Sequence, residues 1–250
     1  MNINSELCIA CKKCVPYCPM GCIFERDKKI FIDHDQCVEC GVCIRNVNCP
    51  VSAIEESILD MPRSVRKAFS DPFGKHLNTK HKHGGRGTEE IKTNDITGMI
   101  NSLDEVAIGI EMGRPGIGAL FSDVEKITKT VSKFDVEYSP FNPVTAYITN
   151  LKTGEMDERI LNEKVLSCII EFKIQTKILL DVLDAVKKAS EGINTVFSVC
   201  VICKIDDENT SIVETQISEA GYNIRAASSK TNLGLGRPSY EERLKSGALE

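Results

Sequence analysis

The sequence has no long hydrophobic run, no basic N-terminal segment and no marked excess of one charge. Its longest apolar run, "VFSVCVI" at 196–202, is far too short to span a bilayer. The start, "MNINSELCIA", lacks both a basic region and an apolar stretch, so we expect no signal peptide and a cytoplasmic location. The formal net charge of −5 gives no reason to expect nucleic acid or a membrane surface as a partner.

Cysteine, by contrast, is abundant and concentrated. Nine of the twelve cysteines lie in the first 49 residues. The run "CIACKKCVPYCP" at 8–19 is nearly repeated by "CVECGVCIRNVNCP" at 37–50, and an offset of 29 residues superposes the first three cysteines of each run. Such an internal repeat predicts two similar half-units. In a cytosolic chain this spacing indicates metal binding more often than disulfides.

The spacing favours iron–sulfur clusters over zinc. A structural zinc site usually takes two CxxC pairs that lie far apart. Three cysteines at CxxCxxC instead give three irons one ligand each, and the fourth iron needs a distant cysteine. Residues 1–58 resemble a bacterial-type ferredoxin with two 4Fe–4S clusters. The resemblance implies that one cluster binds Cys8, Cys11, Cys14 and Cys49 and that the other binds Cys37, Cys40, Cys43 and Cys18.

Two features depart from the simple repeat. The second run has five residues, "IRNVN", before its last cysteine where the simple pattern has three, so the loop over Cys49 is longer. Pro50 still follows, and we expect Cys49 to remain a ligand. Cys22 stands where the second run has Ala53, and it is either a small buried residue or a spare ligand or redox thiol. Between the runs, "IFI" predicts a short strand.

Residues 59–103 predict a basic, Gly- and His-rich linker or extended loop, with one short helix at "RSVRKAF". The stretch 62–92 holds eight Lys/Arg against three Asp/Glu. "GGRGTEE" at 84–90 is either a plain connection or a contact for a small anion or a partner. Three histidines lack a nearby carboxylate or cysteine and form a poor ligand set: His76, His81 and His83.

From residue 104 the pattern alternates strands and helices. We predict strands at 105–111, 135–139, 144–150, 165–172, 194–205 and 222–229, and helices at 118–134, 175–192 and 209–221. This order resembles a ferredoxin-like αβ sandwich of split βαβ units, the fold of ACT-type regulatory domains. The expected fold class is α+β, with a dicluster ferredoxin domain at 1–58, the linker at 59–103 and the sandwich at 104–250.

The first βα turn of that region is rich in glycine. Gly113, Gly116 and Gly118 lead into a predicted helix N-terminus, so the turn is either purely structural or a contact for an anion or substrate. Phe121 stands where a dinucleotide motif would have its last glycine. "NLGLGRP" at 232–238 repeats the Gly-Arg-Pro sequence of this turn.

The remaining cysteines lie in predicted strands. Cys200 and Cys203 form a CxxC pair, but strand residues three apart face opposite sides and cannot chelate together. We expect both to be buried thiols, like Cys168.

Three classes of function fit these features. The first is an iron–sulfur electron-transfer protein or subunit that passes low-potential electrons between a donor and a partner oxidoreductase; no residue set for substrate chemistry stands out, which favours this class. The second is an iron–sulfur reductase acting on a small substrate. The third is a ligand-sensing, ACT-like redox regulator. Low-potential clusters favour an anaerobic cell, and a homo-oligomer through the αβ domain and a small-molecule ligand stay open.

The second class draws on a short resemblance. "GGRGTEEIKTNDITG" at 84–98 is similar to a stretch in iron–sulfur reductases of N-heterocycle breakdown, such as 6-hydroxynicotinate reductase. The candidate substrate contacts would then be Arg86, Glu89, Glu90, Glu111 and Arg114.

Overall fold

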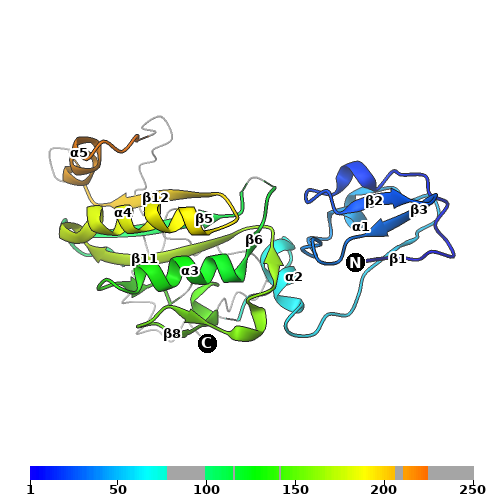
Figure 1. Ribbon diagram of the computed structural model, residues 1–250, viewed down its shortest axis with the longest axis horizontal. Helices are drawn as coiled ribbons and strands as arrows, with labels where there is room; N and C mark the ends of the chain where they lie inside the picture. The colour runs from blue at the N-terminus through cyan, green and yellow to red at the C-terminus, as the bar shows by residue number, and fades with distance from the viewer. Residues whose placement is uncertain (78–98, 115, 141, 206–210, 225–250) are drawn as a thin grey trace, which may run out of the picture.

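The computed structural model describes residues 1–77, 99–114, 116–140, 142–205 and 211–224. Figure 1 shows a small N-terminal part and a larger second part, with helix α2 (Ser64–Ser70) between them. Each part has a hydrophobic core of its own. None of the helices in these ranges has the length and apolar character needed to cross a membrane. The combination of helices with antiparallel sheets makes the fold α+β.

The N-terminal part contains two small antiparallel sheets and one helix. Its elements are β1 (Asn2–Ile3), β2 (Ile23–Arg26), β3 (Lys29–Ile32), α1 (Val42–Asn46) and β4 (Ile54–Glu55), with a 3₁₀ turn at Val15–Tyr17. β1 pairs with β4, and β2 and β3 form a hairpin that contains the predicted "IFI" strand. The hairpin turns at Asp27 and Lys28, whose φ angles of 52° and 59° suit a tight two-residue turn.

The second part is a four-stranded antiparallel sheet covered by helices. Its elements are β5 (Glu105–Met112), β6 (Ala119–Leu120), α3 (Phe121–Val131), β7 (Glu137–Tyr138), β8 (Ile148–Asn150), β9 (Glu155–Met156), β10 (Lys164–Val165), β11 (Cys168–Gln175), α4 (Leu179–Ala189), β12 (Phe197–Cys203) and α5 (Ile212–Glu219). Short 3₁₀ helices lie at Thr145–Tyr147, Glu158–Ile160, Thr176–Ile178 and Ser190–Gly192. The strand order is β12-β5-β11-β7, and every neighbouring pair is antiparallel.

Alternation along the central strand β5 decides how the sheet is covered. Val106, Ile108 and Ile110 have no exposed surface and join the main core with apolar residues of α3 and α4. Figure 1 shows these two helices on the same side of the sheet. Ala107 belongs to a separate cluster with Met99. The period of two therefore places one row of β5 side chains under the helices and the other row on the opposite face.

Several predicted boundaries move because short strand pairings intervene. The helix predicted at 118–134 begins at Phe121, since the two residues before it pair with β10 as β6. The strand predicted at 165–172 begins at Cys168 and continues to Gln175. Residues 222–224 form no strand, and the rest of the last predicted strand lies outside the described residues.

Helix α2 lies within the stretch predicted as a linker and connects the two parts. Its Val65 and Phe69 pack into the core of the second part. Arg66, between them, is 5% exposed and pairs with Glu163 of the second part. The same guanidinium donates to three backbone carbonyls of the N-terminal part, those of His34, Asp35 and Cys37. One buried arginine thus fixes the loop that enters the second cysteine run.

Candidate metal centres

The first group of thiols, which we call set I, consists of Cys8, Cys11, Cys14 and Cys49. They line one cavity together with apolar residues of the N-terminal core. Cys14 is buried whereas Cys11 is exposed, so the group lies close to the surface. Burial raises the pKa of Cys14, and the nearby Cys8, Cys11 and Cys49 raise it further because like charges repel. The fold thus brings this predicted ligand set together around one space.

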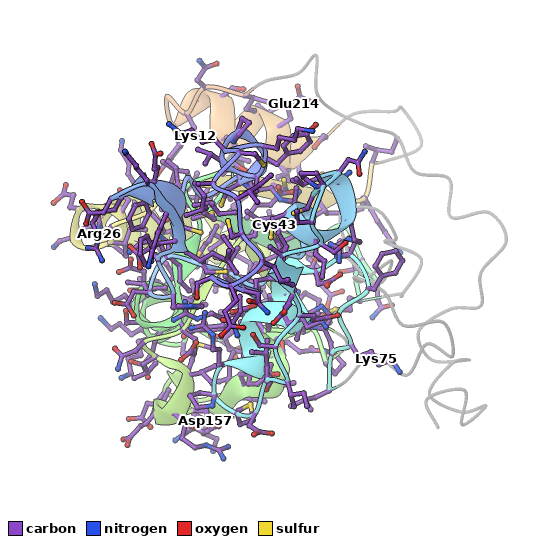
Figure 2. The ribbon with its side chains drawn as sticks, turned by 90° about the vertical axis from the view of Figure 1, so that its right-hand side faces the viewer. Lys12, Arg26, Cys43, Lys75, Asp157 and Glu214 are labelled. Atoms are coloured by element: carbon purple, nitrogen blue, oxygen red, sulfur yellow. The ribbon has the colours of Figure 1, made fainter. Side chains whose placement is uncertain are left out.

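The second group, set II, consists of Cys18, Cys37, Cys40 and Cys43 and lies deeper. The three members from the second run are at most 9% exposed. Burial raises the pKa of Cys43 to about 11, with contributions from Cys40, Cys37 and Cys18. Figure 2 looks onto the N-terminal part, with Cys43 near the centre of the view and Arg26 at its edge.

The two runs share an unusual backbone conformation. Ala10 and Lys12 have φ angles of 54° and 62°, and their counterparts Glu39 and Gly41 have 57° and 68°. These pairs are separated by the 29-residue offset of the repeat. Side chains rarely adopt left-handed φ values, and such positions concentrate at functional sites. Left-handed residues that alternate with ordinary ones turn successive N–H groups toward one point, a concave form that holds many Fe–S clusters.

The last cysteine of each run also accepts a backbone hydrogen bond. The Cys22 N–H donates to Cys18 Sγ at 3.4 Å, and the Ala53 N–H donates to Cys49 Sγ at 3.3 Å. Burial works in the opposite direction, but the amide of Ala53 and its neighbours hold the pKa of Cys49 below its ordinary value. These donors stabilise the thiolate, which is the form of cysteine that binds metal.

The longer spacing before Cys49 is occupied by α1. Arg45, near the end of this helix, donates to the Cys40 carbonyl and pairs with Asp71 at 3.0 Å. Asp71 directly follows α2. Arg45 of this helix therefore supports set II on the side of α2.

Cys22 is buried and contacts set II. Its Sγ lies 3.3 Å from Cys18 Sγ. Hydrogen bonding with Cys22 lowers the pKa of Cys18 to about 6 and that of Cys37 to about 7, while the pKa of Cys22 is raised. Cys22 is thus as buried as Ala53 in the equivalent position, but it also contacts two predicted ligands.

Replacing Cys22 by alanine is expected to change the reactivity of Cys18 in the metal-free chain. Without the donated hydrogen bond, the pKa of Cys18 returns toward its ordinary value. The pH midpoint of its alkylation by iodoacetamide, followed by mass spectrometry, should therefore rise. Removal of the remote thiol in Cys200→Ala is the control and should leave the midpoint in place. An unchanged midpoint in Cys22→Ala would contradict the assigned hydrogen bond.

The donor sets suit a cluster better than a single ion. Within the described ranges, no three His, Cys, Asp or Glu side chains are placed to hold one metal ion. A 4Fe–4S cluster makes a different demand, because each thiolate binds a separate iron. Four thiols, inward N–H groups and apolar walls fit that demand in both sets.

The other cysteines lie in the second part. Complete burial raises the pKa of Cys168 to about 12, as expected for an inert thiol. Cys200 and Cys203 lie three residues apart on β12; the Cys200 thiol donates to Glu111 at 3.8 Å, whereas Cys203 Sγ lies 3.3 Å from Ser211 Oγ. The prediction that both are buried is wrong: they are half-buried, because β12 is an edge strand with a neighbour on one side of the sheet.

Two of the amides that follow the glycine-rich turn are already engaged. At the start of α3, the Phe121 N–H donates to the Glu163 carbonyl and the Ser122 N–H to the Leu161 carbonyl. Two of the groups that would bind an anion at this helix N-terminus are therefore engaged by the chain before β10.

The turn instead packs against the N-terminal part. Gly118 has a φ of 75°, and a Cβ there would lie 2.8 Å from the Val165 carbonyl and 2.9 Å from Met20 Cε. A Cβ at Gly116 would lie 3.4 Å from the Pro19 carbonyl. Only glycine permits this close approach, so the structural interpretation of the turn is the better one.

The predicted substrate contacts are brought together only in part. Arg114 donates to Ser167 Oγ at 3.3 Å and pairs with Glu111 at 3.5 Å. His76 is buried and lies edge-on against Phe69, with ring centroids 4.7 Å apart. Three of the predicted contacts lie outside the described residues: Arg86, Glu89 and Glu90. The same holds for His81 and His83 of the poor ligand set and for the segment 232–238.

Sequence reasoning missed Arg66 and Glu163. The available signal was the helix predicted at "RSVRKAF", where Val65 and Phe69 stand four residues apart on either side of Arg66.

Comparison with known proteins identifies the N-terminal part. Residues 1–24 match the family described as "4Fe-4S binding domain". The chain is 35% identical over 108 residues to a ferredoxin of Rickettsia felis, an alignment that covers 41% of this chain and 96% of that protein. The chain belongs to the ferredoxin family. Its N-terminal part is a bacterial-type 4Fe–4S ferredoxin segment. This segment serves 4Fe–4S cluster binding and iron–sulfur electron transfer.

Two further relatives of this ferredoxin match over shorter stretches. "Ferredoxin 7Fe" of Hydrogenibacillus schlegelii is 46% identical over 54 residues, which are 21% of this chain and 67% of that protein. "Pyruvate synthase subunit PorD" of Methanothermobacter marburgensis is 43% identical over 53 residues, 21% of this chain and 59% of that protein. No solved structure matches the chain.

Proposed function

We propose that this ferredoxin binds two 4Fe–4S clusters and passes low-potential electrons between a donor and a partner oxidoreductase. The first cluster would use set I and the second set II. When bound, each cluster accepts and releases one electron. The observation that carries the proposal is the presence of two groups of four thiols, each completed by a cysteine from the other run.

The residues around each set would hold the thiolates and control access to them. Amide donors such as the Ala53 N–H stabilise negative charge on sulfur. Val47 and Ile30 supply apolar walls for set I. Set II is enclosed more completely, whereas the exposed Cys11 leaves set I open to another protein. An external partner would therefore exchange electrons at set I, with set II on the side of the second part.

The relatives support a role as a subunit or partner of a larger oxidoreductase. One of them is named as a subunit of pyruvate synthase. We also propose that the protein acts in the cytoplasm. Because the proposed clusters have low potentials, they suit an anaerobic cell.

We further infer that residues 104–250 form a ferredoxin-like sandwich of split βαβ units, connected by 59–103 to the cluster domain at 1–58. The units β5-α3-β7 and β11-α4-β12 support this inference. Their strands interleave in the order β12-β5-β11-β7, as a split βαβ arrangement requires.

Metal analysis of the anaerobically purified chain tests the two-cluster proposal. We expect about eight irons and about eight acid-labile sulfides per chain. Electron paramagnetic resonance of the reduced protein should show two interacting one-electron centres. About four irons per chain, or zinc in place of iron, would contradict the proposal.

A further inference from the structure

The two cysteine runs are preceded by the same local structure. The side-chain oxygen of Asn4 accepts N–H bonds from the residues two and three positions later, at 3.0 and 3.4 Å. Asp33, 29 residues further on, accepts the equivalent bonds at 2.9 and 3.3 Å. The first cysteine of each run then donates its N–H to the carbonyl of that same residue. The repeat therefore extends to the backbone of the entry loops.

At the second run this entry loop forms an interface. Arg66 Nη1 donates to three of its carbonyls at 2.9 to 3.0 Å, those of His34, Asp35 and Cys37. Val38 is only 1% exposed. Gln36 accepts a hydrogen bond from Lys164 at 2.6 Å. Arg66 of α2 and Lys164 of β10 thus cover the loop beside set II.

At the first run the equivalent surface is open. The carbonyls that correspond to the acceptors of Arg66 are those of Ser5, Glu6 and Cys8, and none accepts a hydrogen bond from the described residues. Leu7 and Ile9, the counterparts of Gln36 and Val38, are 47% and 62% exposed. Two large apolar side chains therefore stand in solvent on the loop whose three carbonyls correspond to the acceptors of Arg66.

We propose that a redox partner docks on this surface with a helix like α2. An arginine of the partner donates to the carbonyls of Ser5, Glu6 and Cys8, and apolar residues beside it cover Leu7 and Ile9. The proposal rests on the proposed function in that it places the partner next to set I. It also specifies the chemistry of the partner, which is a cationic side chain on an apolar helix.

Charge and availability favour such a partner. The exposed carboxylate of Glu6 lies within the loop and favours a cation. Of the two lysines that line the set I cavity, Lys12 pairs with Glu25 at 2.6 Å, and Lys13 is exposed. A second copy of this chain could not supply α2, because its Val65 and Phe69 are packed in its own core. The partner helix is therefore assigned to a different protein.

The test uses the full, cluster-loaded chain and a fluorescent peptide of residues 62–74, stapled in helical form on the side away from Arg66. Set II is already covered by α2, so the peptide should bind at one site, beside set I. The same peptide with Arg66→Gln should bind about ten- to hundredfold more weakly, as expected for the loss of charge-assisted hydrogen bonds.

Variants of the chain locate the site. Ile9→Asp should abolish peptide binding, whereas Ile212→Asp on α5, where the side chain is 64% exposed, should leave it unchanged. Absence of binding, equal binding of the two peptides, or full binding to Ile9→Asp would overturn the proposal. Iron analysis of the same samples distinguishes a failure of docking from a failure of the clusters to form.

Discussion

Replacing Cys14 by alanine is expected to lower the iron content of the chain from about eight to about four atoms. Cys14 is the buried member of set I, and the other three thiols of that set leave one iron of a 4Fe–4S cluster without a thiolate ligand. Set II shares no cysteine with set I, so its cluster should remain. Iron and sulfide analysis of anaerobically purified variants measures the effect, and Cys168→Ala, which removes a buried thiol of the second part, should retain about eight irons.

Pairs of substitutions test how the two runs are connected. Cys49→Ala added to Cys14→Ala should cause no further loss, because both residues belong to set I and the effects of residues that act as one unit do not add. Cys43→Ala added to Cys14→Ala should remove nearly all iron. If each run instead held its cluster with its own last cysteine, the Cys14 and Cys49 pair would lose both clusters.

Replacing Arg66 by alanine is expected to lower the free energy of unfolding by about 3–5 kcal/mol. The substitution leaves Glu163 as a buried carboxylate without its cation and removes the donor to three carbonyls of the entry loop. Anaerobic urea titration of the cluster-loaded chain, followed by circular dichroism, measures the loss.

The neighbouring residue of α2 provides a matched control. Lys67 pairs with Glu56 at the surface, with its side chain 36% exposed, so Lys67→Ala should cost less than about 1 kcal/mol. Combining Arg66→Met with Glu163→Met should recover much of the loss, because an apolar pair needs no charge compensation. Equal effects of Arg66→Ala and Lys67→Ala would show that the buried pair does not hold the two parts together.

The cysteine spacing predicted which thiols lie together because CxxCxxC keeps three thiols within one loop. The grouping with a distant fourth cysteine depended on the repeat, and the fold brings Cys49 to Cys14 and Cys18 to Cys43 accordingly. The sequence also distinguished helices from strands where the hydrophobic pattern extends over many residues, as in β5 and α4. Short pairings such as β6 with β10 were not, because two residues carry no period.

The sequence by itself determined the chemistry of this ferredoxin: the thiols, their order and the repeat that relates them are local features of the chain. Only the tertiary structure decided how the two halves differ. Arg66 and Glu163 stand 97 positions apart, and their contact covers the entry loop of set II while that of set I stays open. The packing of distant segments also engages two amides at the start of α3 and leaves β12 at a sheet edge. Burial depends on which distant segments pack together, and no local pattern contains that information.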